Sequence, residues 1–202
     1  MENDNSLHAE QLIYAYTSGV FPMADVDGSI NWYRPDPRAI IPIDTYKPAK
    51  SLKPILNRGQ FEIRIDTQFE AVMRACAAPR AYEDETWISE EIIQAYVELY
   101  QMGFAHSVEV YEHDELVGGL YGVHIGSAFF GESMFMKVSN ASKVAFHFLI
   151  EILRANDFSL LDTQFINDNV QRYGAIEIKR AVYEKLLAKS LTCPSEFKLP
   201  SK

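Results

Sequence analysis

Three polar residues with acid-base or hydrogen-bonding capacity occupy apolar stretches of the sequence. Asp162 and Gln164 lie in the run LLDTQ, and Glu132 lies in FFGES. Residues two apart on a strand point to the same side, so Asp162 and Gln164 are predicted to face one site, as are Phe130 and Glu132. An ionised Asp can orient an attacking amine or take its proton, and a Gln amide can donate to a developing oxyanion. The pattern therefore predicts a site built from carboxylates and an amide.

The same carboxylates also fit a structural use. A buried carboxylate is costly unless it is paired or hydrogen-bonded, and backbone N–H groups of loops can supply those bonds. Spacing alone leaves both interpretations open for Asp162 and Glu132.

Other catalytic and cofactor motifs are missing from the sequence. Gly131-Glu132-Ser133 does not start a nucleophile elbow, because G-x-S-x-G requires a glycine where Phe135 stands. There is no Walker loop and no G-x-G-x-x-G, and the histidines and cysteines lack metal-ligand spacing. We expect no cofactor and no metal ion.

The elements that must position these residues follow from hydrophobic periodicity. Three apolar runs separated by short turns predict an antiparallel meander over residues 105–111, 116–124 and 127–133. The third run is expected to end in an acidic turn at Gly131-Glu132-Ser133. Asn140 is predicted to cap the next helix, and residues 158–165 return to the sheet with Asp162.

Upstream segments are predicted from helical spacing and from turn residues. Residues 7–18 read as a helix that Gly19 ends. Residues 21–38 contain three prolines and an Asp-Gly pair, which favour an ordered loop or a short hairpin. The run AIIPI indicates an edge strand interrupted by Pro42, because proline cannot donate to a neighbouring strand.

Two helices are expected between this strand and the meander. Residues 61–65 alternate as in a half-buried strand, and Thr67 with Glu70 predicts a capping box for a helix to about residue 77. Ser89 is the predicted N-cap of the second helix, which Gly103 ends.

Composition limits the protein class. The 202 residues suffice for one domain with a small extension, and no run approaches the roughly 18 apolar residues of a membrane span. The polar start MENDNSLHAE differs from a signal peptide, so we expect a cytoplasmic protein with no membrane partner. The net charge of -9 opposes broad nucleic-acid binding, so any such contact has to be local.

Several separated motifs between residues 12 and 186 resemble a known family. They are YTSGVFPM, NWYRPDPR, TWIS, HSVEVY, GGLYGV, FFGESMF, NASK, LLDTQ, NDN and YGAIEI. Across most of its length, the sequence resembles the bacterial leucyl/phenylalanyl-tRNA-protein transferases.

The resemblance implies an α+β fold. Residues 61–202 would form a GNAT-like acyltransferase domain with a mixed, mainly antiparallel sheet flanked by helices. Residues 1–60 would form a small N-terminal domain, reduced because the family's glycine-rich opening is missing before Leu12.

The resemblance also implies the reaction. Leu or Phe, with Met as a further donor, would pass from aminoacyl-tRNA to the α-amino group of proteins that begin with Arg or Lys, creating an N-terminal degradation signal. The donor is already an activated ester, so ATP, coenzyme A and metal are not needed. The expected partners are Leu-tRNA or Phe-tRNA and the acceptor protein, and the chain is expected to act as a monomer.

Catalytic roles carried over by position fall on four residues. Asp162 would orient or activate the amine, and Gln164 would assist at the reacting carbonyl. Glu132 and Asn167 would hold the network around them.

Substrate-binding roles carried over by position fall on three groups. The aromatics expected at the terminal adenosine are Trp87 and Trp32. The pocket for the donor side chain is expected to contain Leu120, Phe130 and Leu161. The basic residues expected at the tRNA backbone are Lys50, Lys53 and Arg58, for which a solvated face is the alternative.

Two other functions remain as alternatives. An acyl-CoA-dependent GNAT enzyme carries [RQ]-x-x-G-x-[GA], and the nearest match, Gln171 to Ile176, fails at its last position. A catalytically silent tRNA- or peptide-binding module could use the same scaffold, but it would not need Glu132, Asp162 and Gln164 together.

Overall fold

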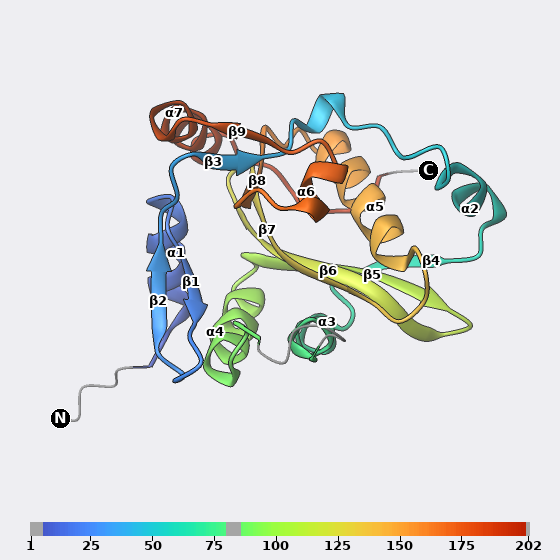
Figure 1. Ribbon diagram of the computed structural model, residues 1–202, viewed down its shortest axis with the longest axis horizontal. Coiled ribbons are helices and arrows are strands. Elements are labelled where there is room, and N and C mark those ends of the chain that lie inside the picture. The colour runs from blue at the N-terminus through green and yellow to red at the C-terminus, as the bar shows by residue number, and fades with distance from the viewer. Residues whose placement is uncertain (1–5, 80–85, 201–202) are drawn as a thin grey trace.

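The computed structural model describes residues 6–79 and 86–200, which form a seven-stranded sheet, a two-stranded hairpin and helices on both faces of the sheet (Figure 1). The strands are β1 Phe21–Ala24, β2 Ile30–Tyr33, β3 Arg38–Ile40, β4 Glu62–Ile65, β5 Ala105–Glu112, β6 Glu115–Ile125, β7 Ala128–Met136, β8 Leu160–Gln164 and β9 Ile176–Ile178. The helices are α1 Ala9–Thr17, η1 Ile43–Thr45, α2 Lys53–Arg58, α3 Phe69–Ala77, α4 Glu90–Gln101, α5 Ala141–Ala155, α6 Asp168–Arg172 and α7 Arg180–Leu191.

The strand order in the large sheet is β4-β5-β6-β7-β8-β3-β9. Neighbouring strands are antiparallel except β7 and β8, which are parallel. The predicted meander is confirmed as β5, β6 and β7, and the expectation of a mixed, mainly antiparallel sheet flanked by helices is also confirmed.

Two hydrophobic cores lie on the two faces of the sheet. Apolar side chains of α1, α3, α4 and α7, including Leu12 and Phe69, pack on one face. Those of α5, including Leu149, pack on the other. Helix α5 comes so close to β6 that a Cβ atom at Gly118 would lie 2.5 Å from the Cβ atom of Ala141, which explains the glycine.

The N-terminal predictions are confirmed except for one strand. The helix over residues 7–18 is α1, and residues 21–38 contain the β1–β2 hairpin. The expected edge strand, however, lies inside the sheet, because β3 pairs with both β8 and β9. Pro42 does not prevent this pairing, because it lies two residues beyond the last residue of β3, Ile40.

The two central helices begin in different ways. Ser89 caps α4 as predicted, because its Oγ accepts a hydrogen bond from the backbone N–H of Ile92. The capping box of Thr67 and Glu70 is wrong, since the N-cap position of α3 is Gln68. The carboxylate of Glu109 on β5 accepts the N–H groups of both Thr67 and Gln68, so a neighbouring strand caps this helix.

The segment before α5 differs from expectation at two positions. Helix α5 begins after Asn140, but Asn140 has a left-handed backbone and makes no capping bond with its side chain. The acidic turn at residues 131–133 is a bulge within β7. Gly122 lies opposite Gly131 and Tyr121 opposite Ser133, so Glu132 is the additional residue.

The helices within residues 6–79 and 86–200 are all too short or too polar to cross a membrane.

Candidate active site

A cleft opens where the two parallel strands separate. The pairing of β7 with β8 ends at Phe130 opposite Asp162, after which β7 continues along β6 and β8 pairs with β3. The cleft has a volume of about 1270 Å³, and its walls include residues 131–137 of β7 and its following turn together with Thr163, Gln164 and Phe165. The sheet therefore provides a ligand-sized space beside the predicted polar residues.

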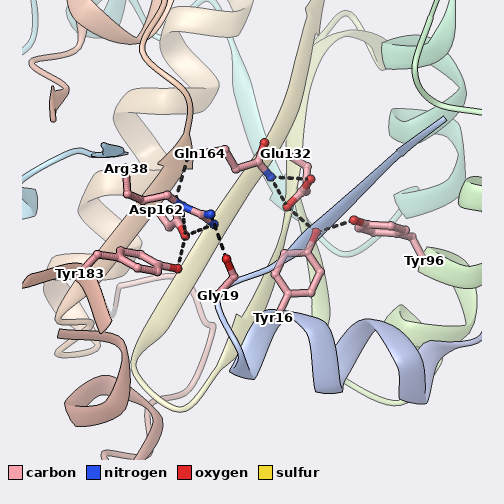
Figure 2. A network of polar contacts seen from close by, with 8 residues as sticks. All are labelled: Tyr16, Gly19, Arg38, Tyr96, Glu132, Asp162, Gln164 and Tyr183. Atoms are coloured by element: carbon pink, nitrogen blue, oxygen red, sulfur yellow. Dashed lines mark hydrogen bonds and ion pairs between the residues drawn. The ribbon is translucent and has the colours of Figure 1, made fainter. Parts of the chain in front are cut away.

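Asp162 lies fully buried beside this cleft in an ion pair with Arg38 (Figure 2). Its Oδ1 accepts Arg38 Nε at 2.9 Å, and its Oδ2 accepts Arg38 Nη2 at 2.7 Å. The Tyr183 hydroxyl donates to Oδ2 at 2.5 Å, and the backbone N–H of Gln164 donates to Oδ1 at 2.8 Å. Asp162 therefore holds three segments of the chain together.

Arg38 shapes the electrostatics around Asp162. Its guanidinium lies 4.9 Å from the ring centroid of Phe21 and 4.7 Å from that of Tyr183, and Nη1 donates to the carbonyl of Gly19. Burial lowers the pKa of Arg38, but the Asp162 carboxylate outweighs this effect and raises it. Burial, and then the negative charge of Asp162, raise the pKa of Tyr183. Arg38 therefore stays charged and Tyr183 stays protonated.

Glu132 is the second carboxylate at the site, and it is only partly buried. The Tyr16 hydroxyl donates to Oε1 at 2.6 Å, and Tyr16 in turn bonds the hydroxyl of Tyr96. Burial raises the pKa of Glu132 to about 7, although the hydrogen bonds from Tyr16 and Gln164 act in the opposite direction. Glu132 can therefore change its protonation state near neutral pH.

Gln164 links the two carboxylates. Its backbone N–H binds Asp162, while its side-chain Nε2 donates to Glu132 Oε1 at 2.9 Å and to Oε2 at 3.0 Å (Figure 2). Its φ of 67° places it in the left-handed region, which is uncommon for a residue other than glycine. The structure thus brings Asp162, Gln164 and Glu132 into one network, as the sequence predicts.

Asn167 lies at the wall of the cleft but outside this network. Its Oδ1 accepts the backbone N–H groups of Asn169 at 2.9 Å and Val170 at 3.0 Å, so it caps α6. Its contacts position a helix rather than Glu132.

The two predicted tryptophans lie in different surroundings. Trp87 lines the cleft and packs against the core. Trp32 lies on β2 with 44% of its surface exposed, and it is not among the described residues that line the cleft.

The predicted apolar pocket residues also divide. Leu120 and Leu161 line the cleft and belong to the core under α5. Phe130 belongs to the core on the opposite face, where its ring centroid is 4.8 Å from that of Tyr16. Phe130 therefore supports Tyr16 from the same face as Glu132.

The predicted basic residues lie on the exposed surface at α2. Lys53 and Arg58 begin and end this helix, and Lys50 precedes it. Figure 1 shows α2 at the end of the molecule opposite α1 and the hairpin, away from the network in Figure 2. A ligand in the cleft could therefore contact these basic residues only if it is long enough to extend from the cleft to α2.

Four residues of the network were not predicted from the sequence: Tyr16, Arg38, Tyr96 and Tyr183. The one available signal was Arg38, a cation directly before the apolar run AIIPI. The tyrosines look like ordinary core residues of helices, and their hydroxyl contacts depend on the tertiary fold.

Comparisons with known proteins agree on one family. The family described as leucyl/phenylalanyl-tRNA protein transferase matches residues 40–188, and its N-terminal domain matches residues 5–36. The leucyl/phenylalanyl-tRNA-protein transferase of Chlorobaculum parvum is 50% identical over 190 residues, which cover 92% of this chain and 98% of the relative. That of Herpetosiphon aurantiacus is 51% identical over 192 residues, covering 95% of this chain and 98% of the relative.

A weaker likeness exists among solved structures. The structure of L-PGS from Bacillus licheniformis has 10% sequence identity, covers 92% of this chain and 71% of that chain, and gives a TM-score of 0.46. This score is too low to support an inference.

Proposed function

The chain belongs to the leucyl/phenylalanyl-tRNA protein transferase family, and on this premise we propose that it moves Leu or Phe, with Met as a further donor, from aminoacyl-tRNA to proteins that begin with Arg or Lys. The match over residues 40–188 carries the proposal, because it includes Glu132, Asp162 and Gln164. The new N-terminal residue would serve as a degradation signal. The need for aminoacyl-tRNA supports a cytoplasmic location.

We propose that residues 61–202 form a GNAT-like catalytic domain and residues 1–60 a reduced N-terminal domain. The mixed sheet flanked by helices supports the first part. The first segment would contribute to the site directly, because β3 enters the large sheet and Arg38 reaches Asp162. We expect the chain to act as a monomer.

The reaction joins an amine to an activated ester, so the site has to orient the amine, stabilise the oxyanion and remove a proton. The acceptor α-amino group has a reference pKa of about 7.7–8.0, so part of it is already neutral near neutral pH. Gln164 lies between the two carboxylates, where its amide can orient groups at the reacting carbonyl. Asp162 fixes the backbone of Gln164.

The donor side chain would occupy the part of the cleft under α5. Leu120 and Leu161 line this part, together with Phe146 and Leu149 of α5. An apolar pocket separates near-isosteric apolar side chains by only about 1–3 kcal/mol, so Leu, Phe and Met would all be accepted.

The tRNA would contact the protein in two places, one at the cleft and one away from it. We propose that the terminal adenosine stacks on Trp87, with Trp32 as a secondary contact. Lys50, Lys53 and Arg58 would meet phosphates further along the tRNA, and their separation from the cleft fits a ligand of that length.

The test is a transfer assay without ATP or coenzyme A. Labelled Leu-tRNA is incubated with two peptides that differ only in an N-terminal Arg or Ala. Label on the Arg peptide alone is the expected result. Binding of tRNA without transfer to either peptide would contradict the proposal and favour a binding module.

The tRNA assignment has its own test in a matched pair of variants. Stacking is worth about 1–3 kcal/mol per base, so Trp87→Ala should raise the KM for aminoacyl-tRNA by roughly 5- to 150-fold. Trp32→Ala should have a smaller effect because its ring lies outside the cleft wall. Equal effects on KM would contradict this division.

A further inference from the structure

The two carboxylates of the site differ in their remaining capacity to accept a hydrogen bond. From this difference we propose that Glu132, rather than Asp162, accepts the proton of the attacking amine. The proposal rests on the transferase activity described above and assigns a catalytic residue within it (Figure 2).

The acceptor positions of Asp162 are already occupied by donors of the protein, so none is left for a proton from the substrate. A carboxylate offers about four acceptor positions. Arg38 and the backbone N–H of Gln164 occupy Oδ1, while Arg38 and the Tyr183 hydroxyl occupy Oδ2. The side chain is also completely buried. Protonation of Asp162 would break a bidentate ion pair, so its role is to position Gln164 and Arg38.

Glu132 has the opposite properties. It lines the cleft and is partly exposed. Oε1 accepts both Tyr16 and Gln164, but of these two donors only Gln164 reaches Oε2. Both donors are neutral, so Glu132 can gain a proton without breaking an ion pair. Oε2 is therefore the oxygen that can receive a proton from a ligand in the cleft.

The groups around Glu132 favour a proton acceptor that works near neutral pH. The hydroxyl of Tyr16 on α1 donates to Glu132, and Tyr96 of α4 and Tyr121 of β6 lie in the same buried group. Burial raises the pKa of all three tyrosines, so their hydroxyl groups stay neutral. Asp162 raises the pKa of Glu132 and Arg38 lowers it, and both effects are smaller than that of burial, which raises the pKa to about 7. A base whose pKa lies close to the working pH is the most effective kind.

The proton balance of the step is complete without another reactant. The amine nitrogen attacks the ester carbonyl carbon, the C–N bond forms, and the nitrogen gives one proton to Glu132. The C–O bond to the ribose then breaks, and the ribose oxygen leaves as a hydroxyl with the proton that Glu132 returns. Glu132 is ionised again at the end of the cycle.

The experiment measures transfer rate against pH with saturating Leu-tRNA and an acceptor whose terminal amine is much less basic than an α-amino group. Such an acceptor stays neutral through the measured range, so its own titration does not contribute. The wild-type rate should fall below pH 7 as Glu132 becomes protonated. Glu132→Gln should lose this pH dependence and about 10²- to 10⁴-fold in rate, the range typical of general base catalysis.

Three further variants make the result decisive. Glu132→Asp keeps a carboxylate and should restore part of the rate and the pH dependence. Asp162→Asn should keep the pH dependence in whatever activity remains. Glu109→Gln, which alters a carboxylate of the same sheet outside the cleft, should leave rate and profile unchanged. The proposal is wrong if Glu132→Gln retains the wild-type pH profile, or if Asp162→Asn is the variant that loses it. Absence of transfer by the wild-type protein would instead refute the proposed function.

Discussion

Glu109 on β5 and Glu132 on β7 are two carboxylates of one sheet, and they have different uses. Glu109 is fully buried and binds the backbone N–H groups of Thr67 and Gln68 together with the Ser107 hydroxyl. Glu132 is partly exposed, binds two side-chain donors and lines the cleft. Burial of a carboxylate is therefore not enough to identify a reactive site. The donors that surround it and its access to a ligand make the distinction.

Asp162 gives the largest expected effect. Asp162→Asn removes one partner of a fully buried ion pair, so the free energy of unfolding should fall by about 3–5 kcal/mol. Transfer should also fall, because loss of the ion pair with Arg38 weakens the support that residue 162 gives to Gln164, whereas aminoacyl-tRNA binding should survive in the folded fraction. Denaturant unfolding and a filter-binding assay measure these changes. An unchanged free energy of unfolding would contradict the structural role assigned to Asp162.

Substitution of Glu109 should lower the stability of the protein without changing its transfer activity. Glu109→Gln replaces the carboxylate that accepts two N–H groups at the start of α3 with a neutral amide oxygen, and these weaker hydrogen bonds should cost about 1–3 kcal/mol. The transfer rate per folded molecule should stay at the wild-type value because Glu109 lies outside the described cleft wall. Urea unfolding and active-site titration test both statements. A loss of kcat would place Glu109 with Glu132 and remove the contrast between them.

Glu132 should affect stability in a pH-dependent way. Its folded-state pKa of about 7 lies above the unfolded value of 4.5, so its favourable contribution is complete below pH 4.5 and is lost as pH rises through 7. Glu132→Gln removes the titration, so its stability relative to wild type should increase by about 3 kcal/mol between pH 4.5 and 8. Thermal melts over this range provide the measurement. A constant difference would mean that burial does not raise the pKa of Glu132.

The smallest effects should come from single donors to the two carboxylates. Thr67→Val removes a hydroxyl that binds Glu109, and Tyr16→Phe removes the one that binds Glu132. Each should lower the free energy of unfolding by about 0.5–1.5 kcal/mol. Only Tyr16→Phe should also raise the pH at which the transfer rate falls, because its hydrogen bond lowers the pKa of Glu132. A shift of the rate profile in Thr67→Val would contradict this.

The sequence predicted the local parts of the fold well. The meander, the hairpin and the Ser89 cap follow from period-2 alternation, turn residues and a short-range hydrogen bond, and they are confirmed. The errors at β3 and α3 share one cause. β3 gains its second neighbour from β9, and α3 gains its cap from Glu109, so both depend on segments far away in the sequence.

The candidate site shows the same difference between local features, which the sequence predicted, and long-range contacts, which it did not. The spacing of Asp162 and Gln164 predicted that they share a face, and the bulge keeps Glu132 within reach of Gln164. Arg38, Tyr16 and Tyr183 could not be assigned from spacing, because they come from β3, α1 and α7. The separation of Trp87 from Trp32 and of Leu161 from Phe130 likewise depends on which face of the sheet each residue occupies.

The connection of Arg38 to Asp162 has a consequence for synthesis of the protein on the ribosome. The two residues are 124 positions apart, and Tyr183 follows Asp162 by another 21. At about 5–20 residues per second, the meander of β5 to β7 is available for folding several seconds before the segment that carries Tyr183. A nascent chain can therefore form much of its sheet early, while its reactive centre assembles last, when α7 closes over Asp162 and Arg38.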